Sequence, residues 1–366
     1  MQFTQNKDEM ASSVQDDLLE WKEIIDDSLT EWEVKLETSG CNYHQFPFWA
    51  RSFRCCGYTP RFFYLGTLET PVAFAAIIEV GDYPFRSALV DRGPFFFDLE
   101  ETEIRECIES FIQLMRKLRY VFIRFSRGQD EIFARIKTLP YAALIEPFPF
   151  CRDSQNALIV DIAKNDDQLL SGFNATIRNE IRRGRALQYE IRTGNSDLDF
   201  ELAWNLFEEL AFKKGFQLSS KPKDFWKELL IRGSSNSLAR LYLCSYDGTL
   251  IAAQIVVRDG EVAELMLAAR NAKCLEIRPG PAALLNWTAM QDCRDLGCGY
   301  YNLGGPGDPK RNNLVYEFKK KFRPELLVAP EPVCLILSRV RFWIWTRIVL
   351  RGWRVWRKRF KRRRTE

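Results

Sequence analysis

The apolar residues of this 366-residue chain follow one arrangement that occurs twice. In each copy, three mostly apolar runs separated by turns predict a meander of antiparallel strands. A longer segment with apolar residues every three or four positions then predicts a helix, and a short aromatic strand follows it. The strands are expected at 61–65, 72–80, 87–91 and 120–125 in the first copy, and at 239–245, 250–258, 262–269 and 300–303 in the second.

The turns and helix ends of the second copy support this arrangement. Asp247-Gly248 and Asp259-Gly260 separate its strands, and Asp-Gly favours tight hairpins because both central turn positions need positive φ. Its helix, over 284–296, is followed by Gly297, a typical helix-terminating residue. The first copy has its helix at 104–118. A meander, a helix and a parallel return strand, repeated about 180 residues apart, predict an α/β (α+β) chain with a duplicated domain.

Other patterns flank and separate the two copies. Residues 7–37 are rich in Asp and Glu and carry apolar residues at three- and four-residue steps, which predicts one N-terminal amphipathic helix packed on the body. Between the copies, a strand at 157–162 precedes three helices. We therefore expect four parts: an acidic helical segment over 1–44, a first domain over 45–155, a second domain over 156–333 and a basic amphipathic helix over 334–366.

The charges of the chain are distributed unevenly. With 53 Lys and Arg against 49 Asp and Glu, the whole chain carries +4 at neutral pH. Residues 335–366 hold twelve of the basic residues and one acidic residue, Glu366, and therefore carry +11. The remaining 334 residues sum to −7. An acidic body joined to a strongly basic tail indicates an anionic partner for the tail.

The pattern of the tail predicts a helix on a membrane surface. Its basic residues gather on one side of a helical projection and its aromatic and aliphatic residues on the other. A charge roughly every four residues excludes a spanning helix, because a central Arg costs on the order of 3 kcal/mol. An interfacial helix fits, with packing on the body or binding to tRNA as the alternatives. The residues expected to contact an anionic membrane are Arg339, Trp345, Arg347, Arg351, Trp353, Arg354 and Trp356.

Composition excludes several classes of protein. Hydrophobic residues make up 46% of the chain and charged residues 28%, which is typical of globular proteins and not of disordered ones. The single histidine, His44, excludes zinc sites with two His ligands, and its surroundings predict a structural role in a loop. No CxxC occurs, and the N-terminus lacks a basic start followed by an apolar run. These features favour a protein of the reducing cytoplasm, and the tail places it on the inner face of the cytoplasmic membrane.

Three stretches carry a resemblance to a known family. They are Arg92-Gly93-Pro94, the run from Leu158 to Arg183, and above all residues 284–322, which read LLNWTAMQDCRDLGCGYYNLGGPGDPKRNNLVYEFKKKF. The last block resembles the "LxW…A…G…YDxGG…FKxxF" ending of the Fem family of peptidoglycan bridge-forming aminoacyltransferases. This resemblance covers roughly residues 45–328. It implies a tandem pair of GNAT-like acyltransferase domains, each a mixed sheet flanked by helices.

The resemblance also implies a reaction. Fem enzymes move an aminoacyl group from aminoacyl-tRNA to an amine of a lipid- or nucleotide-linked peptidoglycan precursor. Such transfer requires placement of the reactants, a donor for the developing oxyanion and removal of a proton from the amine, without a metal or other cofactor. Lys319 matches the family's FK lysine and is expected to stabilise charge at the reacting carbonyl or donor phosphate. Asn302 stands where the family usually has Asp, so this position cannot serve as a base.

Further residues are expected at the site from their position or chemistry. Asp98, four residues after Pro94, is a candidate for orienting or deprotonating the acceptor amine. Arg178, Arg182 and Arg185 share one helical face and are expected to bind a phosphate-bearing partner such as tRNA or a precursor diphosphate. The remaining residues expected to bind substrate are Arg92, Tyr301, Asn302, Gly304, Gly305 and Phe318.

Two other functions compete with aminoacyl transfer from tRNA. The first is an acyl-CoA-dependent N-acyltransferase of the same fold in envelope polysaccharide or lipid assembly, in which Glu264 on a central strand is a candidate base. The usual R-x-x-G-x-G/A pyrophosphate loop is not matched by Arg278-Pro279-Gly280-Pro281-Ala282, which weighs against CoA. The second is a non-catalytic scaffold on the membrane, which the Asn302 departure keeps open.

Overall fold

The computed structural model describes residues 20–25, 29–126, 142–143, 156–215, 218–219, 221–234, 236–271, 277, 280–306, 313–328 and 332–348. These residues divide into two compact units. Unit 1 draws on residues 1–29, 58–147 and 330–366, and unit 2 on residues 30–57 and 148–329. Each unit therefore contains a segment that lies far in sequence from the rest of it.

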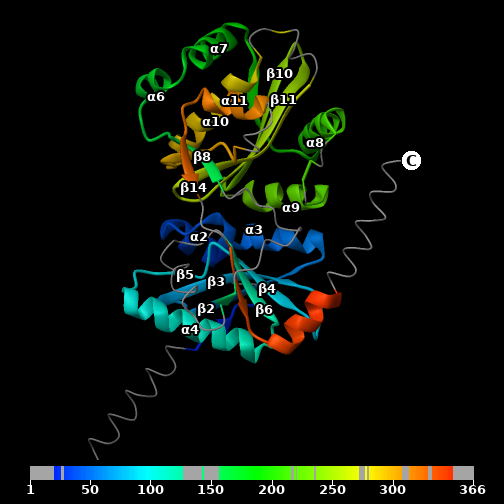
Figure 1. The fold of residues 1–366 in the computed structure, drawn as a ribbon. Coiled ribbons are helices and arrows are strands. Elements are labelled where there is room, and N and C mark those ends of the chain that lie inside the picture. Colours follow the sequence, from blue (N-terminus) through cyan, green and yellow to red (C-terminus); the bar gives the residue numbers. More distant parts are fainter. Residues whose placement is uncertain are drawn as a thin grey trace, which may run out of the picture. The chain divides into compact units, whose positions relative to one another are not determined.

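Unit 1 is a mixed sheet covered by one long helix (Figure 1). Its strands lie in the order β1-β2-β3-β4-β6-β15-β7, with β5 beside β3, and only β4 and β6 pair in parallel. Helix α4 buries Cys107, Phe111 and Met115 against this sheet. The elements are β1 Lys22–Glu23, β2 Thr59–Gly66, β3 Pro71–Val80, β4 Ser87–Asp91, β5 Phe95–Phe96, α4 Glu101–Lys117, β6 Phe122–Ser126, β7 Ala142–Ala143 and β15 Val333–Ile336.

Unit 2 repeats the same plan with more helices. Its strands lie in the order β14-β8-β13-β12-β11-β10-β9, and β12 and β13 are its parallel pair. They are β8 Asn156–Asp161, β9 Glu190–Gly194, β10 Ala239–Tyr246, β11 Thr249–Arg258, β12 Val262–Arg270, β13 Tyr300–Asn302 and β14 Glu325–Val328. Its helices are α2 Leu29–Thr38, η2 Tyr43–Gln45, α3 Pro47–Ser52, η3 Phe53–Cys56, α6 Asp166–Gly172, α7 Ala175–Ala186, α8 Asp197–Lys214, α9 Lys223–Ser234, α10 Ala282–Asp295 and α11 Leu314–Lys320.

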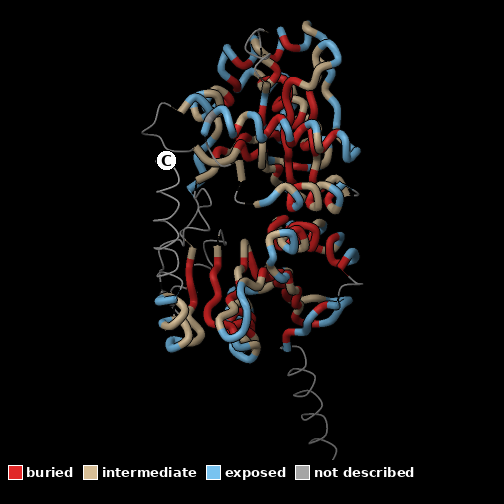
Figure 2. Tube along the Cα trace, turned by 90° about the vertical axis from the view of Figure 1, so that its right-hand side faces the viewer, coloured by how far each residue is buried: buried red, intermediate tan, exposed pale blue. Residues whose placement is uncertain are grey.

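Alternate side chains along the strands of unit 2 point to opposite faces of the sheet, and each face packs against helices. Tyr242 and Cys244 of β10 join the cluster formed by α7 and α10, while α8 packs against β11 and β12. Figure 1 shows α8 and α10 on opposite sides of β10 and β11, and Figure 2 shows the buried residues concentrated in the strands and on the inner faces of the helices. A sheet covered on both faces explains why its central strands are almost wholly apolar.

The predicted fold class is confirmed. Both meanders, both crossover helices and both parallel return strands lie where the hydrophobic pattern places them. In each unit an antiparallel strand from elsewhere in the chain completes the sheet. It is β15 beside β6 in unit 1, and β8 beside β13 in unit 2.

Two predicted elements are corrected at the ends of the chain. A continuous helix over 7–37 is wrong, because Lys22 and Glu23 pair with β2 and a helix begins only at Leu29; residues 1–19 and 26–28 lie outside the described residues. The C-terminal helix does not begin at 334, because Val333–Ile336 pair with β6 as strand β15. Helical structure begins at Arg339 and is described as far as Ile348.

Trp21 and Ile25 test the corrected N-terminal segment, because one continuous helix would place both on its apolar face. In the structure Trp21 is 6% exposed and donates from Nε1 to Ser110 Oγ at 3.0 Å, whereas Ile25 is 81% exposed. We expect Trp21→Ala to lower the free energy of unfolding by about 3–5 kcal/mol, and Ile25→Ala to change it by less than about 0.5 kcal/mol. Urea unfolding followed by tryptophan fluorescence and circular dichroism measures both; equal losses would restore the continuous helix.

Candidate active site

The strands β12 and β13 separate in the middle of unit 2, and the candidate site forms where they do. Their parallel pairing runs from Val262↔Tyr300 to Glu264↔Asn302 and stops there. Beyond that step β12 continues to Arg270 with β11 on its other edge, while Leu303 N–H donates to Leu158 O of β8 at 2.8 Å. In the described part of the chain no strand pairs with this second half of β12 on the β13 side. Among the described residues, the parted strands therefore leave this edge of β12 without a paired strand.

A tight turn follows β13 and receives the candidate catalytic lysine. Asn302 is 5% exposed, and its Oδ1 accepts a hydrogen bond from Gly304 N–H at 2.8 Å. Gly304 has φ of +78°, which favours glycine, and a Cβ added there would lie 3.4 Å from Lys319 Nζ. Lys319 Nζ donates to Gly305 O at 3.1 Å. Lys319 thus lies beside Gly304 and Gly305, and the Asn302 side chain holds the turn that contains them.

The environment of Lys319 changes its acidity. Burial of the ammonium group lowers the pKa of Lys319 to about 8, and the nearby Glu264 carboxylate acts in the opposite direction. At neutral pH the side chain is therefore mostly an ammonium group, poised close to its neutral form. Such a group can donate a hydrogen bond to a developing oxyanion and can exchange a proton near physiological pH.

Glu264 lies on β12 opposite Asn302, at the last paired step of the two strands, and its carboxylate accepts a hydrogen bond from a distant part of the chain. Tyr43 donates from its hydroxyl to Glu264 Oε2 at 2.7 Å, although 221 positions separate the two residues in sequence. From the sequence, Glu264 is a candidate only as a base in a CoA-dependent enzyme, and Tyr43 is not a candidate at all. The only signal that could have found Tyr43 is its place in an aromatic segment beside the single histidine.

An open groove of about 700 Å³ lies in unit 2 between the starts of two helices, the end of β12 and helix α11. Asn174 caps α7 by accepting from Thr176 N–H at 2.8 Å, and α10 begins just after Pro281. The groove combines three cations, two carboxylates and apolar side chains. Its lining residues are Ala175, Thr176, Asn179, Glu180, Arg183, Arg270, Gly280, Ala282, Leu314, Glu317, Phe318 and Lys321. The predicted Phe318 is therefore a groove residue.

The helical face predicted to bind phosphate, which carries Arg178, Arg182 and Arg185, does not line this groove, and its binding role stays a prediction. Ile177 and Ile181 are buried against α10, and this turns Arg183 toward the groove. Arg178 instead donates to Phe173 O at 2.7 Å and so closes the end of α6. The two other predicted arginines do not line the groove. Arg182 donates to Asn179 Oδ1, and the guanidinium group of Arg185 lies over the ring of Trp287.

Three further predicted residues lie elsewhere. Tyr301 is fully buried in the core of unit 2, so its side chain does not face a substrate, and this expectation is corrected. Arg92 and Asp98 belong to unit 1, where both have positive φ, of 51° and 39°. Asp98 is exposed, and Arg92 N–H donates to Ser126 O at 2.8 Å. Their roles in binding and in catalysis stay predictions.

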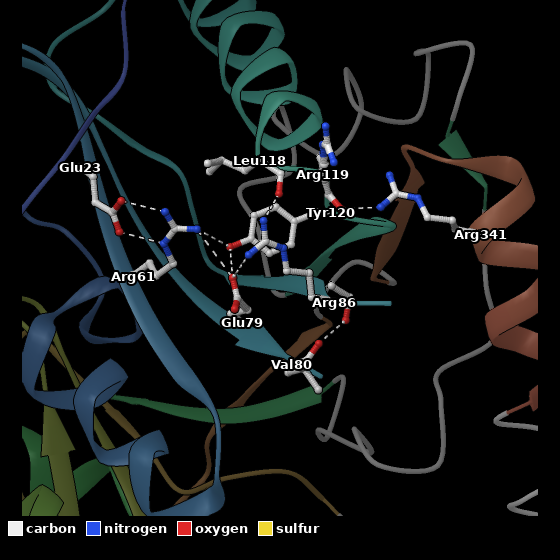
Figure 3. A network of polar contacts seen from close by, with 10 residues as sticks. Glu23, Arg61, Glu79, Val80, Arg86, Leu118, Arg119, Tyr120 and Arg341 are labelled. Carbon is white, nitrogen blue, oxygen red and sulfur yellow. Dashed lines mark hydrogen bonds and ion pairs between the residues drawn. The ribbon is translucent and has the colours of Figure 1, made fainter. Parts of the chain in front are cut away.

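The helical residues 339–348 have an inner and an outer face on unit 1. Phe342 and Trp345 pack against Phe122, and Arg341 donates to Arg119 O at 2.8 Å (Figure 3). Figure 3 also shows how Tyr120, next to Arg119, donates to Glu79 within a network with Arg61 and Arg86. This network fixes the surface that receives the helix.

The outer face differs from the one expected for a membrane helix. Trp345 packs inward on Phe122, so the expectation that it contacts the membrane is corrected. The outer face instead presents Val340, Trp343 and Ile348, whose side chains are 70%, 54% and 57% exposed. Arg347 lies over the ring of Trp343 at 3.8 Å, and the predicted Arg339 is also exposed. The other four predicted contacts lie outside the described residues; they are Arg351, Trp353, Arg354 and Trp356. None of the described helices is both long and apolar enough to span a bilayer.

Comparison with known proteins agrees with this geometry. Residues 171–320 match the family model described as an acetyltransferase (GNAT) domain. Among solved structures, FemX matches with a TM-score of 0.74 and 14% identity, over 89% of this chain and 99% of its own. L-PGS from Bacillus licheniformis matches with a TM-score of 0.53 and 17% identity, over 87% of this chain and 94% of its own. A tandem GNAT protein from the clavulanic acid biosynthesis pathway matches with a TM-score of 0.50 and 11% identity, over 87% and 98%.

No curated protein matches the sequence. The GNAT domain match lies within unit 2, which holds Lys319, Glu264 and the groove. The fold of FemX extends over nearly the whole chain, as the C-terminal motif predicts. The chain therefore has the tandem GNAT fold, with a GNAT acetyltransferase domain matched over residues 171–320, and its fold is similar to that of FemX.

Proposed function

We propose that this enzyme moves an aminoacyl group from aminoacyl-tRNA to an amine of a lipid-linked peptidoglycan or other cell-envelope precursor. The observation that carries the proposal is Lys319, the lysine of the FK motif, held half-buried beside Gly304 and Gly305 where β12 and β13 part. The Fem resemblance implies this reaction class. The likeness to L-PGS from Bacillus licheniformis, and to the C-terminal domain of a putative lysylphosphatidylglycerol synthetase from Agrobacterium fabrum, supports a lipid-linked acceptor.

The site contains the groups that aminoacyl transfer needs. The acceptor amine attacks the carbonyl carbon of the donor ester, a C–N bond forms, and the C–O bond to the tRNA ribose breaks. Lys319, as an ammonium group, donates to the oxyanion that develops on the carbonyl oxygen. The Glu264 carboxylate accepts the proton that the amine releases, and the departing ribose oxygen takes up a proton. These steps use no metal or redox group.

The groove beside α11 is the proposed site for the donor's phosphates. Arg183, Arg270 and Lys321 supply positive charge, and the first turns of α7 and α10 supply backbone N–H groups. Phe318 offers an aromatic face for a terminal base. Glu180 and Glu317 also line the groove and reduce its net charge to +1, which suits one or two phosphates better than an extended nucleic acid backbone.

Acyl-CoA is the second candidate donor, because the family model that matches residues 171–320 is described as an acetyltransferase domain. Both donors present phosphate and adenine groups, so the groove alone does not select between them. The Fem-like ending over 284–322 favours tRNA.

Donor use can be tested with Arg183 and a matched neighbour. Purified protein with a lipid-linked muropeptide is offered labelled aminoacyl-tRNA or labelled acyl-CoA in separate assays. We expect transfer from tRNA only, and a roughly 10-fold or larger rise in donor KM for Arg183→Ala, since a charge-assisted contact contributes about 1.5–3 kcal/mol. Arg182→Ala, one residue away and outside the groove, should retain the wild-type KM. Transfer from acyl-CoA alone would overturn the proposed donor.

The acidity of Lys319 predicts a pH dependence. Because the pKa of Lys319 is lowered to about 8, its ammonium form is lost as the pH rises through that value, and kcat should fall there. Lys319→Ala should lower kcat by about 10²–10³-fold, the usual cost of one oxyanion donor. Lys319→Arg keeps its charge and should lose the alkaline fall. Lys320→Ala, an exposed neighbour, serves as the control; unchanged kcat in Lys319→Ala would contradict the role.

We also propose that the enzyme lies peripherally on an anionic membrane surface. The outer face of residues 339–348 presents Val340, Trp343 and Ile348, and the sequence from 349 to 364 adds nine basic residues. Apolar burial and attraction to anionic lipid act together on such a segment. Attachment to the membrane would bring the enzyme close to a lipid-linked acceptor.

Two neighbouring tryptophans separate membrane contact from packing. Trp343→Ala should weaken cosedimentation with vesicles of phosphatidylglycerol and phosphatidylcholine and leave the melting temperature unchanged, because Trp343 is exposed. Trp345→Ala should lower the melting temperature, because its ring packs on Phe122 with ring centroids 4.9 Å apart. If Trp343→Ala binds vesicles like the wild type, this face does not contact lipid.

A further inference from the structure

The segment between α2 and α3 reaches the candidate site from a distant part of the sequence. Tyr43 lies in η2, belongs to unit 2, and is 1% exposed. Its hydroxyl donates to Glu264 Oε2 at 2.7 Å and lies 3.8 Å from Met266 Sδ. The Fem-like motifs include neither Tyr43 nor any other residue of this segment, so neither the resemblance nor the groove accounts for the contact.

The loop that carries Tyr43 is fastened to the beginning of β12. Asn42 Nδ2 donates to Asp259 Oδ2 at 2.8 Å, and Asp259 Oδ1 accepts from Glu261 N–H and Val262 N–H at 2.9 and 2.6 Å. Asn42 Oδ1 accepts from His44 N–H at 3.2 Å and lies 2.6 Å from His44 Nδ1. One short turn therefore binds both the start of β12 and the glutamate on it.

Aromatic packing fixes the ring of Tyr43 as well as its hydroxyl. The ring stacks on the imidazole of His44 with centroids 4.1 Å apart and meets Trp49 edge-on at 5.1 Å. Trp49 in turn packs on Phe225 of α9 at 5.5 Å. The hydroxyl cannot leave Glu264 without moving this cluster. The structural role predicted for His44 takes a definite form here, as a support for Tyr43.

Glu264 and Lys319 are close enough to interact electrostatically, but they do not form an ion pair. Among the described residues, the partner of Lys319 Nζ is Gly305 O, at 3.1 Å, and the partner of the Glu264 carboxylate is the Tyr43 hydroxyl. Each charged group is thus held by a neutral one. A half-buried carboxylate and ammonium that were free to move would be expected to pair directly.

We propose that Tyr43 is a positioning residue that holds the Glu264 carboxylate apart from the Lys319 ammonium group, so that both stay available to the reactants. This inference rests on the proposed acyl transfer. With the carboxylate fixed by Tyr43, Glu264 accepts the proton of the acceptor amine while Lys319 donates to the oxyanion. Without the hydroxyl, the carboxylate turns to Lys319, and the resulting ion pair occupies the base and the oxyanion donor together.

Kinetics of Tyr43→Phe test the proposal, because this change removes the hydroxyl and keeps the ring that packs on His44. We expect kcat to fall at least 10-fold with little change in the donor KM, and the melting temperature to stay near that of the wild type. Tyr246→Phe, which removes a hydroxyl that does not contact Glu264, should retain full kcat. A Tyr43→Phe enzyme with wild-type kcat overturns the proposal.

The titration of Lys319 gives a second readout that requires no acyl donor. Trace acetylation with acetic anhydride over a pH series, followed by mass spectrometry of the Lys319 peptide, measures its apparent pKa. The wild-type midpoint should lie near 8. It should rise in Tyr43→Phe, because the released carboxylate pairs with the ammonium group, and fall in Glu264→Gln, because the carboxylate charge is removed. Tyr43→Phe/Glu264→Gln should match Glu264→Gln alone.

The outcomes distinguish failure of the Tyr43 positioning role from failure of the proposed acyl transfer. A midpoint that is the same in Tyr43→Phe and the wild type overturns the positioning role, whatever the activity. A raised midpoint in an enzyme that transfers no acyl group from either donor supports the Tyr43 arrangement and removes the proposed function instead.

Discussion

The parallel pairing of β12 and β13 ends at the step from Glu264 to Asn302, and the candidate site depends on that ending. If the two strands stayed paired, their backbone groups would be satisfied by each other and Lys319 would have no space beside Gly304. The separation follows from two neighbours: β12 continues along β11, while the chain after β13 continues along β8. The Lys319 ammonium group can therefore lie where the two strands part, and its burial there lowers its pKa to about 8.

The proposed chemistry relies on two charges that are close and separately held. Both are held by uncharged groups: Lys319 donates to the carbonyl oxygen of Gly305, and Glu264 accepts from the hydroxyl of Tyr43. Helix α11 and its C-cap residue contribute Phe318 and Lys321 to the groove, while Lys319 of the same helix reaches the turn after β13. Placement by a rigid scaffold is the main requirement of acyl transfer to an amine, and it needs few specialised side chains.

Local patterns in the sequence predicted the repeated meander, both crossover helices and the Lys319 turn, because each depends on residues that are neighbours in the chain. Contacts between distant segments were not predictable in this way. The pairing of β15 with β6 and the reach of Tyr43 to Glu264 leave no periodic signal. The groove arginine, Arg183, was not singled out because spacing shows which residues share a face, whereas the burial of Ile177 and Ile181 decides which face points to the groove.

The central claim is that Lys319 receives the acyl carbonyl while the groove receives the donor's phosphate. A crystal structure of the enzyme with an amide-linked 3′-aminoacyl adenosine phosphate, a stable form of the aminoacyl-tRNA end, tests this directly. The account predicts the carbonyl oxygen within hydrogen-bond distance of Lys319 Nζ and the phosphate beside Arg183. A ligand bound in unit 2 with its carbonyl away from Lys319, or bound only in unit 1, would contradict it.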